Sequence, residues 1–197
     1  MNIIYILLTM TLWGLVHSLT ASLTIKEKAA KIFGSRFMRL YRLLYNGFAL
    51  ITFLPVMGLV ATLPNQMLYV IPKPWSYVMT AGQGASAFLL LVAVLQTDAL
   101  HFAGLKQLFV EDTKGSLTTS GLYKIVRHPI YTFSLLFLWL IPRMNDNMFV
   151  FYIGVTLYFI IGAYFEERKL LREFGEDYAA YKKSTAMLIP GLSIGKK

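Results

Sequence analysis

The sequence predicts an all-α, polytopic membrane protein with five transmembrane helices, and three observations lead to this class. Of the 197 residues, 56% are hydrophobic and only 15% are charged, and the mean hydropathy is +0.56, unlike an ordinary soluble domain. The apolar residues gather in stretches of about 20, the length that crosses a hydrocarbon core of about 30 Å. The chain has no cysteine. Disulfides, thiolate metal ligands and cysteine-linked lipid anchors are therefore excluded, and the membrane attachment must come from spans.

The first three spans are expected over residues 3–23, 43–63 and 75–97. The polar members of the first are mostly hydroxyl residues, which can hydrogen-bond back to their own helix or across to a neighbour. The third carries Gly82 and Gly84, where another helix could approach closely.

A short fourth span is expected over residues 129–142 and a fifth over 149–165, separated by the polar segment 143–147. We interpret this segment as a tight turn, so that the last two spans form an antiparallel hairpin. The whole chain, residues 1–197, is treated as one domain that contains this hairpin within about residues 117–190.

Positive charge in the loops predicts the orientation. Of the 19 Lys and Arg residues, all but Lys73 and Arg143 fall on one side of the membrane in this topology. That side is expected to be the cytoplasm, which places the N-terminus outside and the C-terminus inside. The net charge of +9 therefore mainly records orientation, and the basic run between the first two spans is assigned to anionic lipid contact, with no nucleic-acid partner.

The start of the fourth span combines a helix mouth with basic side chains. Pro129 suits the first helical position, where its missing N–H would be unpaired anyway. Arg127 and His128 then stand at a helix N-terminus whose free amides favour an anion, and an arginine can bind a carboxylate or phosphate in bidentate fashion.

Two carboxylates, Glu166 and Glu167, end the fifth span on the same side, where they suit a cation. Counted from Met144 at 1.5 Å per residue, Pro129 and Glu166 differ in level by about 10 Å. Direct contact is therefore not expected, but the two ends could bracket a zwitterionic ligand. Either feature alone is most often a topology anchor or a solvated helix face; their combination in one hairpin favours a binding site.

The hairpin carries a recognisable signature. The residues from Gly121 to Tyr131, read as Gly-Leu-Tyr-Lys-Ile-Val-Arg-His-Pro-Ile-Tyr, are followed by Glu166-Glu167, Phe174-Gly175, Tyr178, Tyr181 and Pro190. In order and spacing this resembles the C-terminal signature of the isoprenylcysteine carboxyl methyltransferase-like membrane family, which includes phospholipid, methanethiol-type and NnrU-like members. Segments near Trp13, Tyr41 and Asp98 resemble the methanethiol-type and NnrU-like branch more closely.

The resemblance implies S-adenosylmethionine as methyl donor, with no metal required. The donor's amino acid end needs a carboxylate for its ammonium group and a cation or helix mouth for its carboxylate. Neighbouring helix residues point about 100° apart, so only one glutamate need face the donor, and Glu167 is taken as that one. We assign to the donor site, by this resemblance, Tyr123, Arg127, His128, Pro129, Tyr131, Glu166 and Glu167.

The acceptor side is expected to involve His17, Arg42 and His101. An acceptor thiol or carboxylate must be ionised and an amine neutral, which gives a general base a role. His17 lies within the first span, where an ionisable residue marks either a functional site or an interhelical hydrogen bond. His101 follows Asp98 by three residues, so that the two either orient each other for catalysis or form an interfacial capping pair. Arg42 lies at the inner end of the second span.

These residues predict a membrane methyltransferase that uses S-adenosylmethionine on a small or lipophilic thiol, carboxylate or amine. The expected location is the bacterial inner membrane, with lipid as neighbour and the active site facing the cytoplasm. One alternative is a non-enzymatic, NnrU-like accessory protein with a degenerate donor site. The other is a nicotinamide-dependent membrane reductase, because sterol reductases carry a similar Arg-x-Pro-x-Tyr segment; the short chain and the glutamate pair disfavour it.

Overall fold

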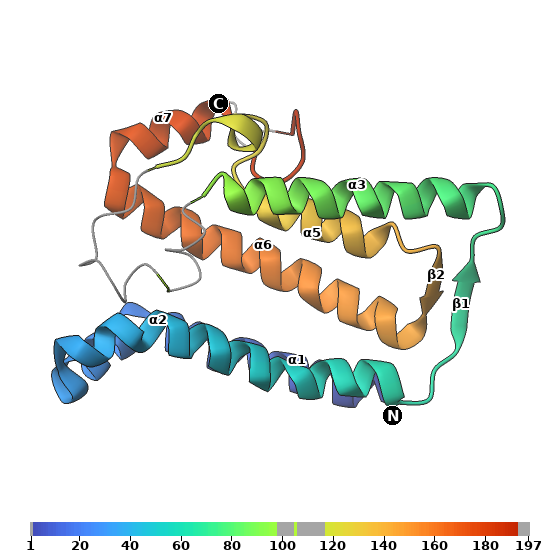
Figure 1. Cartoon of the computed structure of the whole chain (residues 1–197), viewed down its shortest axis with the longest axis horizontal. Helices are drawn as coiled ribbons and strands as arrows, with labels where there is room; N and C mark the ends of the chain where they lie inside the picture. Colours follow the sequence, from blue (N-terminus) through green and yellow to red (C-terminus); the bar gives the residue numbers. More distant parts are fainter. Residues whose placement is uncertain (1, 98–104, 106–116, 193–197) are drawn as a thin grey trace. The chain divides into compact units, whose positions relative to one another are not determined.

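The computed structural model describes residues 2–97, 105 and 117–192 (Figure 1). The predicted helical class is confirmed, with two short strands added. In chain order the elements are α1 (Asn2–Ala21), α2 (Leu23–Thr62), β1 (Met67–Val70), α3 (Trp75–Leu95), the 3-10 turn η2 (Gly121–Lys124), α5 (Pro129–Trp139), β2 (Arg143–Asn145), α6 (Asp146–Phe174) and α7 (Glu176–Ser184).

Four helical segments within the described residues are long and apolar enough to cross a membrane: Ile3–Ala21, Arg36–Thr62, Trp75–Leu95 and Asp146–Phe174. The protein is thus an integral membrane protein by the length and composition of its helices. The short fourth span expected over residues 129–142 is not confirmed, because α5 has only 11 residues, or about 16 Å of helix. The orientation of the termini stays a prediction.

The chain divides into two compact units, and each is described by itself. Unit 1 contains residues 1–66, 98–114 and 145–154, and unit 2 contains residues 67–97, 115–144 and 155–197. Helix α6 belongs to unit 1 up to Gly154 and to unit 2 from Val155 onward. The assignment of one domain to the whole chain stays a prediction.

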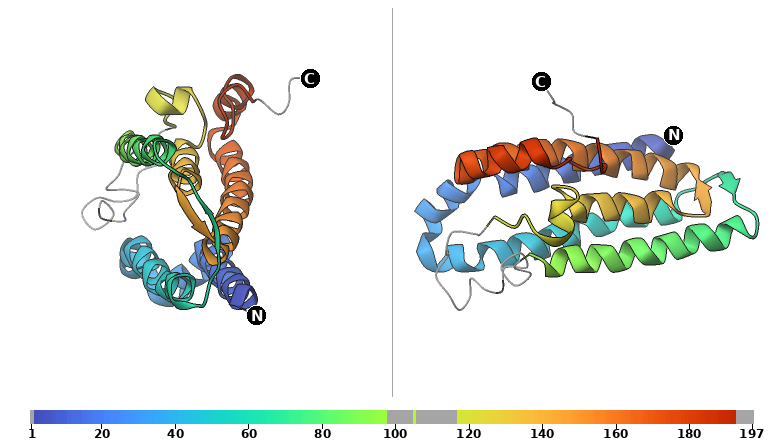
Figure 2. Two further views of the ribbon diagram at one scale, coloured as in Figure 1. Left: turned by 90° about the vertical axis from the view of Figure 1, so that its right-hand side faces the viewer. Right: turned by 90° about the horizontal axis from the view of Figure 1, so that it is seen from above.

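Unit 1 is built on the antiparallel pair α1 and α2, seen in blue and cyan in Figures 1 and 2. Polar side chains tie the pair together: the Trp13 indole donates to the Ala49 carbonyl at 3.1 Å, and the Tyr41 hydroxyl donates to the Thr20 carbonyl at 2.6 Å. Such bonds satisfy backbone oxygens that cannot reach water in a bilayer. Helix α2 extends over the expected loop, with a break at Gly34, where φ is 77°.

Unit 2 is built on α3 packed against α5. The close approach expected at Gly82 is confirmed, since a Cβ atom there would lie 3.0 Å from Leu140 Cδ1. A Cβ atom at Gly84 would meet no described atom within 4 Å, so Gly84 has no such role there. The Gln83 amide adds a bond to the Phe137 carbonyl at 2.8 Å. The small residue at the helix contact is what lets these two backbones come together.

The segment expected as a tight turn is mostly strand. Residues Arg143–Asn145 form β2, which pairs with β1 in a two-stranded sheet, and α6 starts at Asp146. The Tyr69 hydroxyl donates to the Ile141 carbonyl at 3.1 Å and helps to hold the segment that precedes β2. This segment matters for the site, because it is not helical and the rise of about 1.5 Å per residue does not apply to it.

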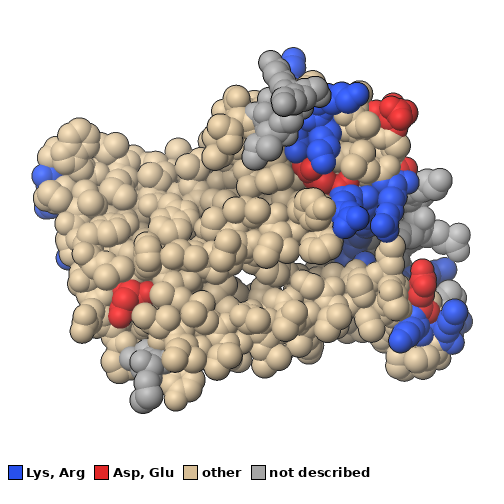
Figure 3. All heavy atoms as spheres, turned by 180° about the vertical axis from the view of Figure 1, so that it is seen from behind, with Lys and Arg blue, Asp and Glu red and all other residues tan. Residues whose placement is uncertain are grey.

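The surface agrees with a lipid environment. On the face drawn in Figure 3, most of the area is uncharged, and the Lys, Arg, Asp and Glu side chains gather near its edges. Many large apolar side chains on the long helices are exposed, among them Leu12, Leu50, Trp75 and Phe88. In water such an area would be far larger than a monomeric soluble protein tolerates.

Candidate functional site

A short turn that begins at a glycine leads into the residues of the site. Gly121 begins η2 with φ +60°, and a Cβ atom there would lie 2.4 Å from Gln96 Nε2. The Gln96 side-chain oxygen accepts a hydrogen bond from the Leu122 N–H at 2.8 Å. The end of α3 therefore holds the start of η2, and glycine is the residue that permits both the positive φ and the close contact.

The residues before α5 are fixed by the segment that follows α7. The Arg127 N–H donates to the Ala186 carbonyl at 2.8 Å, and the His128 N–H donates to the Met187 carbonyl at 3.1 Å. Pro129 occupies the first helical position, as predicted. The amides of the two residues after it precede the first intrahelical donor, Thr132 N–H to His128 O, so by position they face the open end of the helix.

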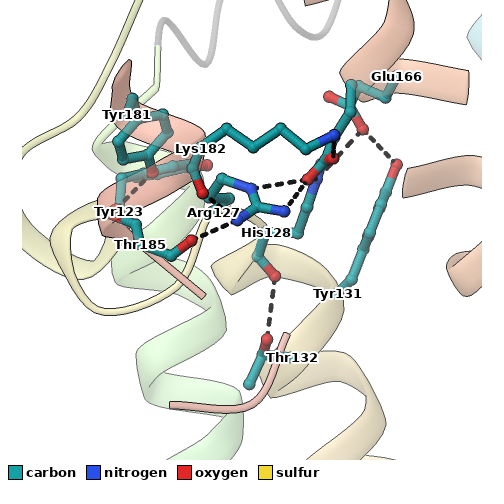
Figure 4. A network of polar contacts seen from close by, with 10 residues as sticks. Tyr123, Arg127, His128, Tyr131, Thr132, Glu166, Tyr181, Lys182 and Thr185 are labelled. Atoms are coloured by element: carbon teal, nitrogen blue, oxygen red, sulfur yellow. Dashed lines mark hydrogen bonds and ion pairs between the residues drawn. The ribbon is translucent and has the colours of Figure 1, made fainter. Parts of the chain in front are cut away.

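A buried ion network joins α5, α6 and α7 (Figure 4). The Arg127 guanidinium binds Glu167 through two nitrogens: Nε donates to Oε1 at 2.7 Å, and Nη2 forms an ion pair with the same oxygen. Its remaining nitrogen donates to the carbonyls of Lys182 and Thr185. The Lys182 ammonium lies 2.8 Å from Glu167 Oε2. Glu167 is only 3% exposed, and a carboxylate so buried requires this pairing.

Glu166, the next residue on α6, has a different environment. Its side chain is 45% exposed, and its Oε2 accepts a hydrogen bond from the Tyr131 hydroxyl at 2.9 Å. The Tyr131 ring stacks on His128 on one side and on Phe159 on the other, with centroid distances of 5.4 and 4.7 Å. This stacking places the hydroxyl at the solvent-exposed carboxylate (Figure 4).

These contacts correct the expected separation of about 10 Å between the two ends of the hairpin. The count from Met144 assumed helix throughout, but α5 ends at Trp139 and the next residues up to β2 are not helical. The helical rise of about 1.5 Å per residue therefore does not hold over the whole of that arm of the hairpin. The mouth of α5 consequently reaches the level of the glutamate pair.

Two buried polar atoms in the network have no hydrogen bond within the described residues, the Tyr178 hydroxyl oxygen and His128 Nε2. The His128 Nε2 atom lies 3.5 Å from Glu167 Oε1, close enough for an ion pair but outside hydrogen-bond geometry. The Nδ1 atom lies 3.6 Å from Glu166 Oε2. The imidazole therefore stands between the two carboxylates, each of which it can contact by a small rotation.

Three tyrosines close the network on the α7 side. Tyr178 is 1% exposed, and burial raises the pKa of its hydroxyl above the ordinary value, with the charge of Glu167 adding to the effect. Burial raises the pKa of Tyr181 to about 12, and its hydroxyl donates to the Tyr123 carbonyl. The pKa of Tyr123 is also raised, first by burial and then by Glu166. These hydroxyls stay neutral near pH 7, and those of Tyr123 and Tyr181 donate hydrogen bonds to the Ala93 and Tyr123 carbonyls.

All seven residues predicted for the donor site therefore lie together in unit 2. Sequence reasoning did not find two further members, Lys182 and Thr185, which bind Glu167 and Arg127 respectively. They come from α7 and its end, more than 50 residues after Arg127, and lysine or threonine in a short polar helix gives no local sign of such a contact.

The residues predicted for the acceptor side lie elsewhere or outside the described residues. His17 is in unit 1, stacked on Trp13 with a centroid distance of 4.8 Å, and the Tyr45 hydroxyl lies 2.7 Å from its Nε2. The interhelical hydrogen bond that was the alternative to a functional role is thus present. Arg42 is one helical turn from Tyr45 on α2, also in unit 1. His101 and Asp98 fall outside the described residues.

Apolar helices of membrane-spanning length, together with a cluster of positive and negative side chains at the start of α5, define a class: a helical membrane protein with a buried charged cluster at the end of its helices. Comparison with known proteins makes the class specific. The profile of the phospholipid methyltransferase family matches residues 77–177, and the chain belongs to this family of methyltransferases. The resemblance stated from the sequence is thereby confirmed.

Individual relatives agree. The chain is 38% identical over 109 residues to methanethiol S-methyltransferase of Pseudomonas deceptionensis, and the aligned region covers 53% of this chain and 42% of that protein. It is 39% identical over 110 residues to methanethiol S-methyltransferase 2 of Bradyrhizobium diazoefficiens, with coverage of 52% and 42%. For the Mycobacterium tuberculosis enzyme of the same name the identity is 31% over 105 residues, with coverage of 51% and 43%. The matches thus span less than half the length of these relatives, and no solved structure matches the chain significantly.

Proposed function

We propose that this chain is an integral membrane methyltransferase that uses S-adenosylmethionine to methylate a small thiol. Family membership and the names of the relatives support methyl transfer and a small thiol such as methanethiol. The observation that carries the proposal is the cluster in unit 2, where an exposed carboxylate lies beside a helix N-terminus that has no side-chain cap. The comparisons do not favour the accessory-protein and reductase alternatives.

The donor's amino acid end has one ammonium and one carboxylate group, and the cluster fits both. Glu166 supplies an exposed carboxylate, with Tyr131 fixing one of its oxygens. The N-terminus of α5, which no side chain caps, supplies amides and the positive end of the helix dipole for an anion. The unsatisfied Nε2 of His128 provides a further polar contact at the same place.

We assign the donor ammonium to Glu166, although the sequence favoured Glu167. The Glu167 carboxylate is already bound by Arg127 and Lys182 and is almost completely buried. To bind a ligand it would have to give up a partner, which costs several kcal/mol for a buried ion pair. Glu167 instead positions Arg127, whose guanidinium in turn binds the Lys182 and Thr185 carbonyls at the end of α7.

Bound S-adenosylmethionine supplies an electrophilic methyl group, whose bond to the sulfonium sulfur breaks as the bond to the acceptor sulfur forms. The chain's tasks are to hold the donor by its charged end, to align the acceptor and to exclude water. The acceptor must be a thiolate, so its proton passes to a base. Our candidates for the acceptor side remain His17, hydrogen-bonded to Tyr45, together with Arg42 and His101.

The site is proposed to face the cytoplasm from a bacterial inner membrane, because the donor is a polar cytosolic compound and the basic residues lie mostly on that predicted side. Membrane lipid surrounds the spans. The alternative acceptors are a prenylated carboxylate and a lipid amine. The names of the relatives, which refer to methanethiol, do not support them.

Binding of the demethylated donor product tests the donor site directly. Titration calorimetry of the full chain in detergent with S-adenosylhomocysteine should give saturable binding with one site per chain. S-adenosylhomocysteine and adenosine should differ strongly in affinity, because only the former has the charged end that the cluster recognises. Equal affinity for the two compounds, or no saturable binding, would show that the donor site is not at this cluster.

A further inference from the structure

A second feature lies outside the proposed donor site: the basic arm, residues 23–33. It lies in unit 1 between the candidate spans Ile3–Ala21 and Arg36–Thr62. The Ser22 side chain accepts a hydrogen bond from the Ile25 N–H at 3.4 Å and starts a new helix there. At its other end Gly34 adopts φ 77° and ψ 179°, and the helix changes direction. The arm is thus a helical piece across the turn of the α1–α2 hairpin (Figure 2).

The arm is amphipathic. At about 100° per residue, Ile25, Ala29, Ile32 and Phe33 fall on one face about 100° wide, with Lys26 at its edge. The opposite face carries Thr24, Glu27, Lys28 and Lys31. Ala29, in the middle of the apolar face, is buried, at 9% exposed. Ile32 and Phe33, on the same face, are 72% and 60% exposed. The apolar face is therefore only partly covered by the protein.

The charge of the arm has one dominant sign. Lys28 and Lys31 are exposed, Arg36 follows directly after the Gly34 break, and Glu27 is the single acidic residue between Leu23 and Arg42. Basic residues beside exposed large apolar residues are the composition of helices that lie at a bilayer surface, with lysines among the headgroups and apolar side chains below them.

We infer that the basic arm is an interfacial helix that binds anionic phospholipid headgroups of the membrane that holds the chain. Spans on both sides tether it at the level where the chain leaves the hydrocarbon, so the nearest extended anionic surface is the bilayer itself. Ile32 and Phe33 insert at the boundary of headgroups and acyl chains, and Lys28, Lys31 and Arg36 contact the headgroups. This goes beyond the proposed methyl transfer and does not depend on it.

The absence of cysteine makes a clean test possible. Phe33→Cys and Thr24→Cys, each labelled with a polarity-sensitive fluorophore, are compared in nanodiscs of phosphatidylcholine with and without phosphatidylglycerol. The label at position 33 should shift to the blue when phosphatidylglycerol is present and be quenched by spin-labelled lipid. The label at position 24, on the polar face of the same helix, should keep a water-like spectrum in both.

Charge dependence is tested with Lys28→Gln/Lys31→Gln in the Phe33→Cys background. The blue shift caused by phosphatidylglycerol should be reduced in this variant and should weaken in 1 M salt, where the Debye length is about 3 Å. Circular dichroism controls for lost helix. Equal spectra at positions 24 and 33, a shift at 33 independent of phosphatidylglycerol, or the same shift produced by a soluble RNA in phosphatidylcholine discs would each overturn the inference.

Discussion

Glu166 and Glu167 are adjacent and chemically identical, yet their surroundings give them different tasks. One carboxylate is exposed and held by a tyrosine hydroxyl, and the other is buried between an arginine and a lysine. The 100° between neighbouring helix residues produces this difference. The sequence predicts that the pair belongs to the site, but the choice between the two depends on α7, whose position cannot be derived from local pattern.

Substitution of the exposed carboxylate should weaken donor binding without unfolding. Glu166→Gln keeps the size and the hydrogen bond from Tyr131 but removes the charge that would pair with the ammonium. We expect S-adenosylhomocysteine to bind more weakly by about 1.5–3 kcal/mol, the range for hydrogen bonds to charged groups. Glu173→Gln, an exposed acidic residue seven positions later on α6, is the matched control and should bind normally in the same calorimetric titration.

Removal of the buried arginine should instead lower stability. Arg127→Met leaves the carbonyls of Lys182 and Thr185 without a donor and Glu167 with one cation fewer. Breaking a buried pair from one side typically costs about 3–5 kcal/mol, and the remaining Lys182 should keep the loss at the lower end. Thermal unfolding in detergent, followed by circular dichroism, measures it. Arg172→Met, on the exposed surface of α6, should melt with the parent chain; equal melting of both variants would contradict the network's role.

At the scale of elements, the hairpin of α5 and α6 shows which helix boundaries the sequence pattern predicts and which it does not. The sequence predicts the proline start of α5 correctly, because Pro129 at a first helical position has a local cause. It does not predict where α5 ends. The helix is expected to continue to residue 142, but it ends at Trp139, and Arg143–Asn145 pair with β1; strand pairing between distant segments leaves no helical-period signal.

Helix α2 gives a second case. The sequence predicts a span from residue 43, because the charges before it are typical of a loop, but the helix begins at Leu23. Charged residues such as lysine are good helix formers, so charge density identifies the side of the membrane and says little about helicity.

The turn before α5 should be sensitive to a single methyl group. Gly121→Ala has to hold φ +60° and would place its Cβ 2.4 Å from Gln96 Nε2, so that Gln96 must move and lose its bond to the Leu122 N–H. We expect a loss of about 1–3 kcal/mol of stability, from the backbone conformation and the lost hydrogen bond. Thermal melting of Gly121→Ala, Gln96→Ala and the double variant forms a cycle. Fully additive losses would show that the two residues do not interact.

For the whole molecule, the sequence predicts the membrane class from composition alone, and four of the five expected spans have the necessary length. The exception is the fourth, which is ambiguous in the sequence, since the 14 residues from Pro129 to Pro142 are too few to span and too apolar for an exposed helix. The orientation is predicted from the distribution of basic residues relative to the membrane, so a labelling experiment in the membrane is needed to test it.

Labelling from one side of the membrane tests the orientation. In the cysteine-free chain, Asn65→Cys lies between α2 and β1, and Lys183→Cys lies on α7, both exposed. In intact spheroplasts an impermeant maleimide should modify position 65 and leave position 183 unmodified, whereas a permeant maleimide should modify both. The reverse pattern would place the donor site on the outer face and contradict the proposed access to cytosolic donor.

Transfer of a labelled methyl group tests the central claim most directly. The full chain in proteoliposomes is given S-adenosylmethionine labelled at the transferred methyl group, together with methanethiol, an amine or a prenylcysteine carboxylate as acceptor. Our account predicts labelled dimethyl sulfide, formed by the parent chain and by Glu173→Gln and strongly reduced in Glu166→Gln. If S-adenosylhomocysteine binds but no acceptor receives label, or if Glu166→Gln transfers as fast as the parent chain, the proposed function of this site is wrong.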